Sequence, residues 1–166
     1  MINVSELSRL YDIRKLGNTD VDDILDLCEG NTQFYQYCEA KLTREQVLND
    51  LHITPPGIEL SDKYYIGFYQ KDVLMSVMDL IDGYPEPDIA FIGFFMMRKE
   101  LQGQQIGSAI IQETASYLKT VGKTAIQLGI DKENPQSTHF WRKNGFRVIR
   151  EVEREGWTIL VAEKAL

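Results

Sequence analysis

Two glycines and a serine interrupt the chain between a long apolar run, residues 89–97, and an amphipathic run, residues 106–121. The first run predicts a buried strand and the second predicts a helix, so the residues between them form a strand-to-helix turn. Such a turn leaves the first backbone N–H groups of the helix without partners, and the positive end of the helix dipole points into it. Because small residues allow close approach to the backbone, the turn predicts a phosphate-binding site. The residues of this turn are Gln102, Gly103, Gln104, Gln105, Ile106, Gly107 and Ser108.

A second stretch carries an asparagine, two adjacent aromatic residues and a glycine. Asn134 and Pro135 are typical of the first positions of a helix, and Gly145 is typical of the position just past its end. The aromatic pair between them is Phe140 and Trp141. The pattern predicts a short helix that carries both aromatic side chains.

These two stretches resemble, in order and spacing, the two signatures of the GNAT superfamily of acyl-CoA-dependent N-acetyltransferases. The first signature is (Q/R)-x-x-G-x-(G/A). Gln102, Gln105 and Gly107 occupy its defined positions, and Gln105 stands where the first glycine is usual. The second signature is an asparagine, an aromatic pair and Gly-Phe, which matches the stretch from Asn134 to Phe146. The resemblance covers residues 74–152 well and the N-terminal third loosely.

The resemblance implies an α/β fold, with a central, mostly antiparallel, splayed β-sheet and helices on both faces, in a single domain over residues 1–166. It also implies acetyl-CoA as the acyl donor and the primary amine of a small molecule or a peptide as the acceptor, joined directly in a ternary complex. The pyrophosphate of the cofactor would contact the turn at 102–108, and the pantetheine arm would contact the backbone of Phe95 and Met97. Asn134, Phe140 and Trp141 would complete the cofactor site.

Acyl transfer needs the two substrates held together, the carbonyl oxygen stabilised and the leaving thiolate accommodated. By its position in the family pattern, the backbone N–H of Met97 is the candidate donor to the carbonyl oxygen. The family usually has a tyrosine as general acid where this chain has Trp141, whose indole N–H does not donate a proton at neutral pH. A thiol has a pKa of about 8.5, so a thiolate can leave without help. We therefore expect Trp141 to be a packing wall for the acyl-CoA, and we interpret His139 as a surface or capping histidine.

Asp79 is the candidate general base for the amine. It ends an alternating stretch in which Val73, Met75 and Val77 share its face, so the sequence predicts a carboxylate that closes an apolar stripe. Such a carboxylate is expected to have a raised pKa and to accept a proton through water. A structural acid bonded to the backbone is the competing interpretation, and the alternative bases are Asp88, Asp131 and Tyr84.

The remaining pattern predicts the elements that hold these residues. Strands are expected at 11–16, 64–69, 73–81, 124–130, 146–152 and 157–162, with a hairpin across 70–72 and a bulge or splay at Gly93. Helices are expected after Thr19, Thr43 and Asn134, with a capping box at each threonine. The aromatic cluster of Phe34, Tyr35 and Tyr37 is interpreted as core or, by the resemblance, as the lining of the acceptor pocket. The helix from residue 104 is expected to bury Ile106, Ile110, Tyr117 and Val121.

Composition narrows the class of protein further. The chain has 166 residues, 43% of them hydrophobic and 26% charged, which suits one domain with a substantial core. A net charge of -7 argues against a nucleic-acid partner, which needs a basic surface. The sequence has neither the order of a signal peptide nor an apolar run of membrane length, so a cytoplasmic location and no membrane partner are expected. Cys28 and Cys38 lack metal-ligand spacing, which predicts free thiols and no metal.

Two other functions stay open at this point. The missing tyrosine and Gln105 are also compatible with a non-catalytic acyl-CoA-binding regulatory or interaction module. A nucleotide-binding domain would use the same turn for phosphates, but the chain lacks a P-loop lysine and a Rossmann acid. Many GNAT proteins are dimers, and the strand at 157–160 is expected to be an exposed edge on which a second copy can pair. The sequence leaves the homodimer open.

Overall fold

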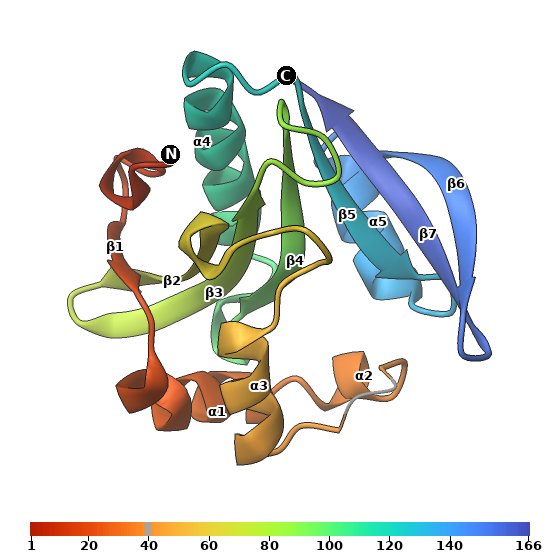
Figure 1. Cartoon of the computed structure of the whole chain (residues 1–166). Helices are drawn as coiled ribbons and strands as arrows, with labels where there is room; N and C mark the ends of the chain where they lie inside the picture. The colour runs from red at the N-terminus through yellow and green to blue at the C-terminus, as the bar shows by residue number, and fades with distance from the viewer. Residues whose placement is uncertain (39–40) are drawn as a thin grey trace.

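Residues 1–38 and 41–166 are described by a computed structural model of the chain, which is built around one mixed β-sheet (Figure 1). The sheet has seven strands in the order β1-β2-β3-β4-β5-β7-β6. Every neighbouring pair is antiparallel except β4 and β5, which are parallel. The central, mostly antiparallel sheet expected from the sequence is therefore confirmed. The strands are β1 (Asp12–Lys15), β2 (Lys63–Gln70), β3 (Val73–Asp82), β4 (Ile89–Met97), β5 (Ala125–Asp131), β6 (Arg147–Arg154) and β7 (Trp157–Ala165).

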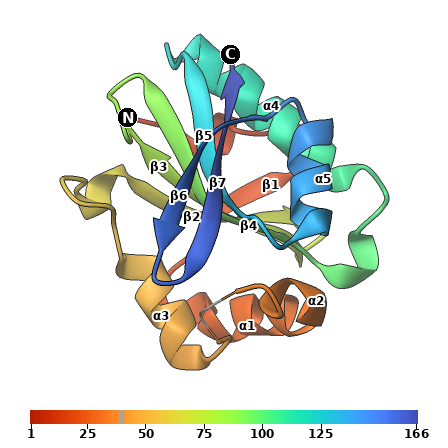
Figure 2. The same ribbon diagram turned by 90° about the vertical axis from the view of Figure 1, so that its right-hand side faces the viewer.

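Helices cover both faces of the sheet, as expected (Figures 1 and 2). On one face lie α4 (Ile106–Thr120) and α5 (Pro135–Lys143), whose apolar residues join those of the sheet in one core cluster. On the other face lie α1 (Val21–Glu29) and α3 (Arg44–His52), which form a second cluster with β2 and β3. The one-turn helix α2 (Thr32–Tyr35) follows α1. Short 3-10 turns occur at Val4–Glu6, Asn18–Asp20, Leu60–Asp62 and Lys99–Leu101.

The two parallel strands separate part of the way along their length. β4 and β5 pair only from Ile89 opposite Ala125 to Ile92 opposite Leu128, and beyond that point each strand continues without the other. On the other side of β4, Asp79 is opposite Phe94 while Leu80 is opposite Ile92, so Gly93 is an extra residue. This β-bulge lies where the expected bulge or splay was placed, and the opening between the strands begins just after it.

Of the three helix starts expected to have a capping side chain, two have it in the structure. Thr43 caps α3 by accepting from the backbone of Gln46, and Asn134 caps α5 by accepting from Ser137. The capping box expected at Thr19 is absent. The chain enters α1 through the 3-10 turn at Asn18–Asp20, so Thr19 lies inside that turn rather than ahead of the helix. The carboxylate of Asp20 instead accepts from the backbone N–H of Gly17.

Two further expectations are wrong. The strand β7 is not an edge, because after β6 the chain turns back and β7 pairs with both β5 and β6. The edges of the sheet are β1 and β6. Val121 is 44% exposed rather than buried, because α4 ends at Thr120 and Val121 is its C-terminal flanking residue.

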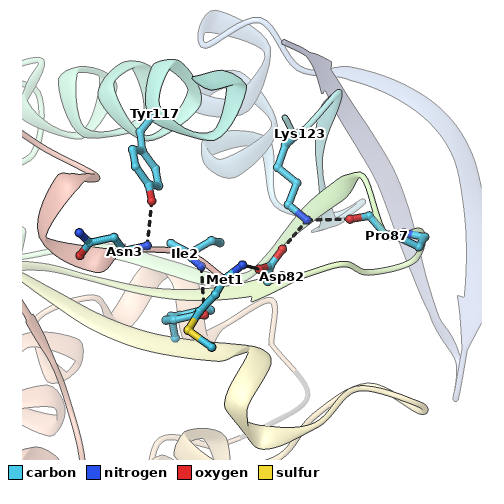
Figure 3. Close-up of polar contacts among 8 residues, drawn as sticks. Met1, Ile2, Asn3, Asp82, Pro87, Tyr117 and Lys123 are labelled. Atoms are coloured by element: carbon cyan, nitrogen blue, oxygen red, sulfur yellow. Dashed lines mark hydrogen bonds and ion pairs between the residues drawn. The ribbon is translucent and has the colours of Figure 1, made fainter. Parts of the chain in front are cut away.

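The N-terminal segment is fastened to the sheet and to α4 by backbone hydrogen bonds (Figure 3). The N–H of Ile2 donates to the hydroxyl of Tyr64 over 3.2 Å, and the N–H of Asn3 donates to the hydroxyl of Tyr117 over 2.8 Å. Nearby, Lys123 pairs with the carboxylate of Asp82 and donates to the carbonyl of Pro87. Among the helices that the structure describes, none is both long enough and apolar enough to cross a membrane.

Candidate active site

A pocket of about 130 Å³ lies where β4 and β5 separate. It is lined by residues from β4, the following turn, α5 and the α1–α2 junction. Six of the lining residues were expected at a cofactor site, namely Phe95, Met97, Gln102, Asn134, Phe140 and Trp141. The others are Asn31, Gln33, Phe34, Met96, Lys99, Gln136 and Ser137. The tertiary structure thus gathers residues from four parts of the chain, and sequence reasoning placed only part of the set.

The backbone of β4 turns two of its amides toward the opening. Arg98 donates its backbone N–H to the carbonyl of Met75 on β3, over 2.8 Å. Since hydrogen-bonding directions alternate along an antiparallel strand, the amides of Phe95 and Met97 point away from β3. No strand pairs with that side of β4 beyond Ile92, so both amides face the opening. A ligand with an extended amide backbone can add to this free strand edge.

An aromatic wall closes the pocket on the α5 side. Phe95 and Phe140 stack with ring centroids 5.8 Å apart and planes inclined by 18°. Trp141 is buried and meets Phe140 edge-on at 5.0 Å and Phe146 at the same distance. These pairs make a rigid apolar surface opposite the β4 amides. Trp141 therefore lies in the packing position expected for it, while His139 is exposed on α5.

The turn before α4 explains the unusual residue in the first signature. Gln105 has φ +63°, which is the left-handed conformation that glycine adopts at least cost. Its side chain is exposed and so lies outside the turn. The backbone amides of residues 103–108 have no acceptor among the described residues of the protein. The turn therefore offers unpaired donors at the positive end of a fifteen-residue helix.

Gly107 connects this turn to the pocket. A Cβ at this position would lie 3.3 Å from side-chain atoms of both Met97 and Phe140. The helix start thus packs directly against the strand end and the aromatic wall. Because Gly107 has no side chain, the helix start, the strand end and the aromatic wall can pack together.

The side chain of Gln102, which is expected at the cofactor site, also has partners within the protein. Its Nε2 donates to Oδ1 of Asn31 over 2.5 Å and to the carbonyl of Met97 over 3.3 Å. Asn31 is 5% exposed, and its Nδ2 donates to the carbonyls of Leu27 and Met97, each over 3.1 Å. In the sequence, the pair Gly30-Asn31 indicates only a helix break. No local pattern marks a contact with a strand end 66 residues further along the chain.

Asp79 lies beneath the bulge of β4 rather than in the pocket lining. Its Oδ2 pairs with the Nζ of Lys63 over 2.6 Å, and a Cβ on Gly93 would lie 2.7 Å from the same oxygen. Its Oδ1 is buried and has no hydrogen-bond partner among the described residues. Burial raises the pKa of Asp79 to about 6, Lys63 acts to lower it, and Asp50 acts to raise it. The raised pKa expected for this carboxyl follows from its burial.

The alternative bases lie elsewhere and have other partners. Asp88 is exposed and accepts from the hydroxyl of Thr124 over 2.6 Å. Asp131 accepts from the backbone N–H of Glu133. Tyr84 packs edge-on against Phe91. None of the three lines the pocket.

The face of the sheet opposite α4 carries the aromatic cluster expected near the acceptor. Phe34 meets Tyr35 at 5.1 Å and Phe94 of β4 at 5.9 Å, both edge-on. Phe34 lines the pocket, so α2 borders the opening as well as the core. Within residues 1–38 and 41–166, no group of three or more His, Cys, Asp or Glu side chains is arranged to hold a metal ion.

Comparison with known sequences identifies the family to which the chain belongs. The model of the acetyltransferase (GNAT) family matches residues 24–146 of this chain. An uncharacterized N-acetyltransferase of Methanocaldococcus jannaschii is 26% identical over 167 residues, which span 96% of this chain and 70% of that protein. Spermidine N(1)-acetyltransferase of Thermoplasma acidophilum is 21% identical over 154 residues, which span 82% of this chain and 88% of that protein.

Solved structures show the same fold. An acetyltransferase from Thermus thermophilus superimposes with a TM-score of 0.74 at 20% identity, covering 94% of this chain and 97% of that chain. The PaiA N-acetyltransferase from Thermoplasma acidophilum, solved in complex with coenzyme A, gives a TM-score of 0.67 at 19% identity, covering 94% of this chain and 99% of that chain. At these identities the likeness establishes the architecture alone.

Proposed function

Because this chain belongs to the GNAT acetyltransferase family, we propose that it transfers an acetyl group from acetyl-CoA to a primary amine by direct attack in a ternary complex. One observation carries the proposal. The unpaired amides of Phe95 and Met97 and the aromatic wall border one opening, and the turn at 103–108, whose amides are also unpaired, packs against this lining through Gly107. An acyl-CoA has an amide-bearing arm and a pyrophosphate, which are the groups that these two sets of donors suit. The complex of a structural relative with coenzyme A supports the same ligand.

In this proposal the cofactor lies along the free edge of β4. The pantetheine arm hydrogen-bonds to the N–H of Phe95 and its acyl end lies at Met97, its pyrophosphate lies in the turn, and the aromatic wall covers its apolar side. Asn134, which is buried and lines the pocket, contributes its side-chain amide from the start of α5. The N–H of Met97 donates to the carbonyl oxygen as negative charge develops on it.

The proposed chemistry needs one base and no general acid. The amine nitrogen attacks the thioester carbonyl carbon, the C–S bond breaks, and coenzyme A leaves as the thiolate. Asp79 takes the proton lost by the amine, through water, because its carboxylate lies at the bulge of β4 and has an unpartnered oxygen. Before the transfer, the ion pair with Lys63 holds the charged form of Asp79 in place.

The acceptor is an amine on the side of α2 and Phe94. A relative named spermidine N(1)-acetyltransferase makes polyamines the first class to test, followed by amino acids, aminoglycosides and peptide N-termini. Release of the free thiol of coenzyme A, followed with each amine, measures turnover directly. Turnover with at least one amine supports the proposal. Binding of acetyl-CoA without turnover in the whole panel would favour the non-catalytic acyl-CoA-binding module.

A matched pair of variants ties turnover to the opening. Gly107→Val puts a branched side chain 3.3 Å from Met97 and Phe140, so it should abolish acetyl-CoA binding. Gly17→Val is the control, because a Cβ there meets nothing within 4 Å and its φ of −141° suits any residue. Equal activity in the two variants would contradict the proposed cofactor site.

A second copy of the chain stays a proposed partner, now through β6 rather than β7. β6 is an edge strand, and its Ile149 and Val152 are 49% and 37% exposed. The order Ile149-Arg150-Glu151-Val152 is self-complementary when two strands run antiparallel, with opposite charges and apolar residues facing each other. Light scattering after size exclusion should give a dimer mass, and Glu151→Lys should reduce it to the monomer. A monomer mass for the natural chain would end the idea.

A further inference from the structure

Asn31 makes a set of hydrogen bonds that its local surroundings do not require. It occupies the N-terminal capping position of α2, yet its side chain accepts from none of the α2 amides. A capping bond is worth about 1 kcal/mol to a helix, and α2 has only four residues. The side chain turns instead toward β4 and the turn that follows it. Asn31 thus gives up the local capping bond, which indicates that its bonds to Met97 and Gln102 are stronger than that bond.

The contact fixes the end of β4. The peptide group between Met97 and Arg98 is held on both sides, because its N–H donates to the carbonyl of Met75 over 2.8 Å. Its carbonyl accepts from Asn31 over 3.1 Å and from Gln102 over 3.3 Å. Because the Met97 carbonyl has these donors, it is not a free acceptor for a ligand. The orientation of the strand end beside the Met97 N–H is set by Asn31.

The same side chain connects two parts of the site that lie far apart in sequence. Oδ1 of Asn31 accepts from Gln102, which is the first residue of the turn at 102–108. Nδ2 of Asn31 donates to Leu27, the carbonyl four residues earlier in α1. Asn31 is followed directly by α2, whose Phe34 borders the pocket and packs on Phe94. A buried network that is fully hydrogen-bonded transmits a change at one member to the others.

We propose that Asn31 is a positioning residue that couples acyl-CoA binding at the turn to the order of α2 on the acceptor side. Acyl-CoA held by the turn fixes Gln102, Gln102 fixes Asn31, and Asn31 fixes both the strand end at Met97 and the start of α2. The consequence is that a bound acyl donor strengthens the contacts that hold Phe34 in place for the amine. This inference rests on the proposed function for the identity of the ligand.

Hydrogen exchange tests the coupling without any need for activity. In the natural chain, saturating acetyl-CoA should slow exchange of the backbone amides at 32–36 on α2. The Asn31→Ala and Gln102→Ala variants should each lose this protection while still binding acetyl-CoA in calorimetry. Gln102→Ala keeps the experiment decisive if Asn31→Ala does not fold, because Gln102 is only half-buried. Protection of α2 that persists in a folded variant would overturn the proposal.

A double-mutant cycle gives the second test. Each single variant should lower kcat about tenfold, which is the effect of losing one buried hydrogen bond, with KM for acetyl-CoA nearly unchanged. Because the two residues act through one network, the double variant should also lose about tenfold rather than a hundredfold. Additive losses would show that the residues act separately and would overturn the coupling.

The control is Gln127→Ala. Gln127 is also a buried amide with a side-chain hydrogen bond, to Glu163, but it lies on β5 outside the pocket. It should lower the unfolding temperature without changing either the kcat or the α2 protection. Loss of α2 protection in this variant would mean that general destabilisation explains the result, which overturns the role of Asn31. An inactive natural chain that still shows the coupled protection would refute the proposed transfer reaction and leave Asn31 in its role.

Discussion

At the scale of single residues, Gln105 shows how backbone conformation governs the choice of side chain. Its φ of +63° is the reason that glycine is usual at this position of the signature. A non-glycine residue pays about 1–2 kcal/mol for the left-handed conformation. The side chain is exposed, so we expect the departure from the signature to affect stability more than the proposed phosphate contacts.

This leads to a first prediction. Gln105→Gly should leave the affinity for acetyl-CoA unchanged and alter the free energy of unfolding by less than about 1 kcal/mol, because relief of strain is offset by greater chain entropy. Gln105→Val should destabilise the fold by more than that, since a β-branched residue is a genuine outlier at positive φ. Thermal unfolding and calorimetric titration measure the two effects. A large gain of affinity in the glycine variant would show that the glutamine side chain obstructs the turn.

A second prediction concerns Asp79. Burial raises its pKa to about 6, so the carboxyl is protonated below that pH and cannot accept a proton from the amine. We expect kcat/KM to fall as the pH decreases through about 6 and to level off above it. Asp79→Asn should remove this dependence and lower the rate at least tenfold, a conservative bound because a general base usually contributes about 10²–10⁴-fold.

The control for Asp79 is Asp72→Asn. Asp72 lies in the exposed turn between β2 and β3, where its carboxylate pairs with Arg14. The pH–rate profile of the Asp72→Asn variant should match that of the natural chain. An unchanged profile in Asp79→Asn would leave the carboxylate as a structural partner of Lys63 and return the role of base to another group.

At the scale of elements, the site depends on where each helix begins. The α5 helix starts at Pro135 after the Asn134 cap, and its first turn contributes Gln136 and Ser137 to the pocket. The α4 helix starts just beyond Gln105, and Gly107 in its first turn packs against Met97 and Phe140 of the pocket lining. The opening in the sheet is also an element-scale feature, because the bulge at Gly93 precedes the point where β4 and β5 part.

The third prediction belongs to this scale. Asn134→Ala removes the capping bond to Ser137 and should destabilise the protein by about 1 kcal/mol, lowering the unfolding temperature by about 2–4 °C. Thr43→Ala removes the equivalent bond at α3, away from the pocket, and serves as the control. Both should lose similar stability, while only Asn134→Ala should also weaken acetyl-CoA binding. Equal affinity in the two variants would remove Asn134 from the cofactor site.

At the scale of the whole molecule, the sheet has α4 and α5 on one face and α1 and α3 on the other, and in the proposed function the cofactor and the acceptor approach from these two sides. Two apolar clusters, one with α4 and one with α1 and α3, keep these faces apart. The opening between β4 and β5 is where the two sides meet. A ligand that fills it should therefore stabilise the fold as a whole.

The fourth prediction follows from this arrangement. Acetyl-CoA at a hundred times its dissociation constant should add about 2.7 kcal/mol to the free energy of unfolding. For a chain of this size that is an increase of about 5–10 °C in the unfolding temperature. ATP and NAD at the same concentration should give a much smaller shift, which thermal unfolding can compare directly. An equal shift with all three would favour a general nucleotide site.

Local pattern was sufficient to predict much of this protein. The two signatures were identified by their resemblance to the GNAT superfamily, and the family match confirms that resemblance. The central strand at 89–97 and the helices that follow it were predicted from spacing and capping within short stretches, and each lies close to where it was expected. These features depend on neighbouring residues, so the sequence by itself determined them. The same is true of the bulge at Gly93.

Only the tertiary structure decided the rest. The insertion of β7 between β5 and β6, the pairing of Lys63 with Asp79 and the bonds of Asn31 to Met97 and Gln102 join residues far apart in the chain. Neither hydrophobic periodicity nor helix-capping residues predict such contacts, because the contacts form only when separate elements pack and bury their polar groups together. Burial then sets the pKa of Asp79 and forces Asn31 to find its partners across the site.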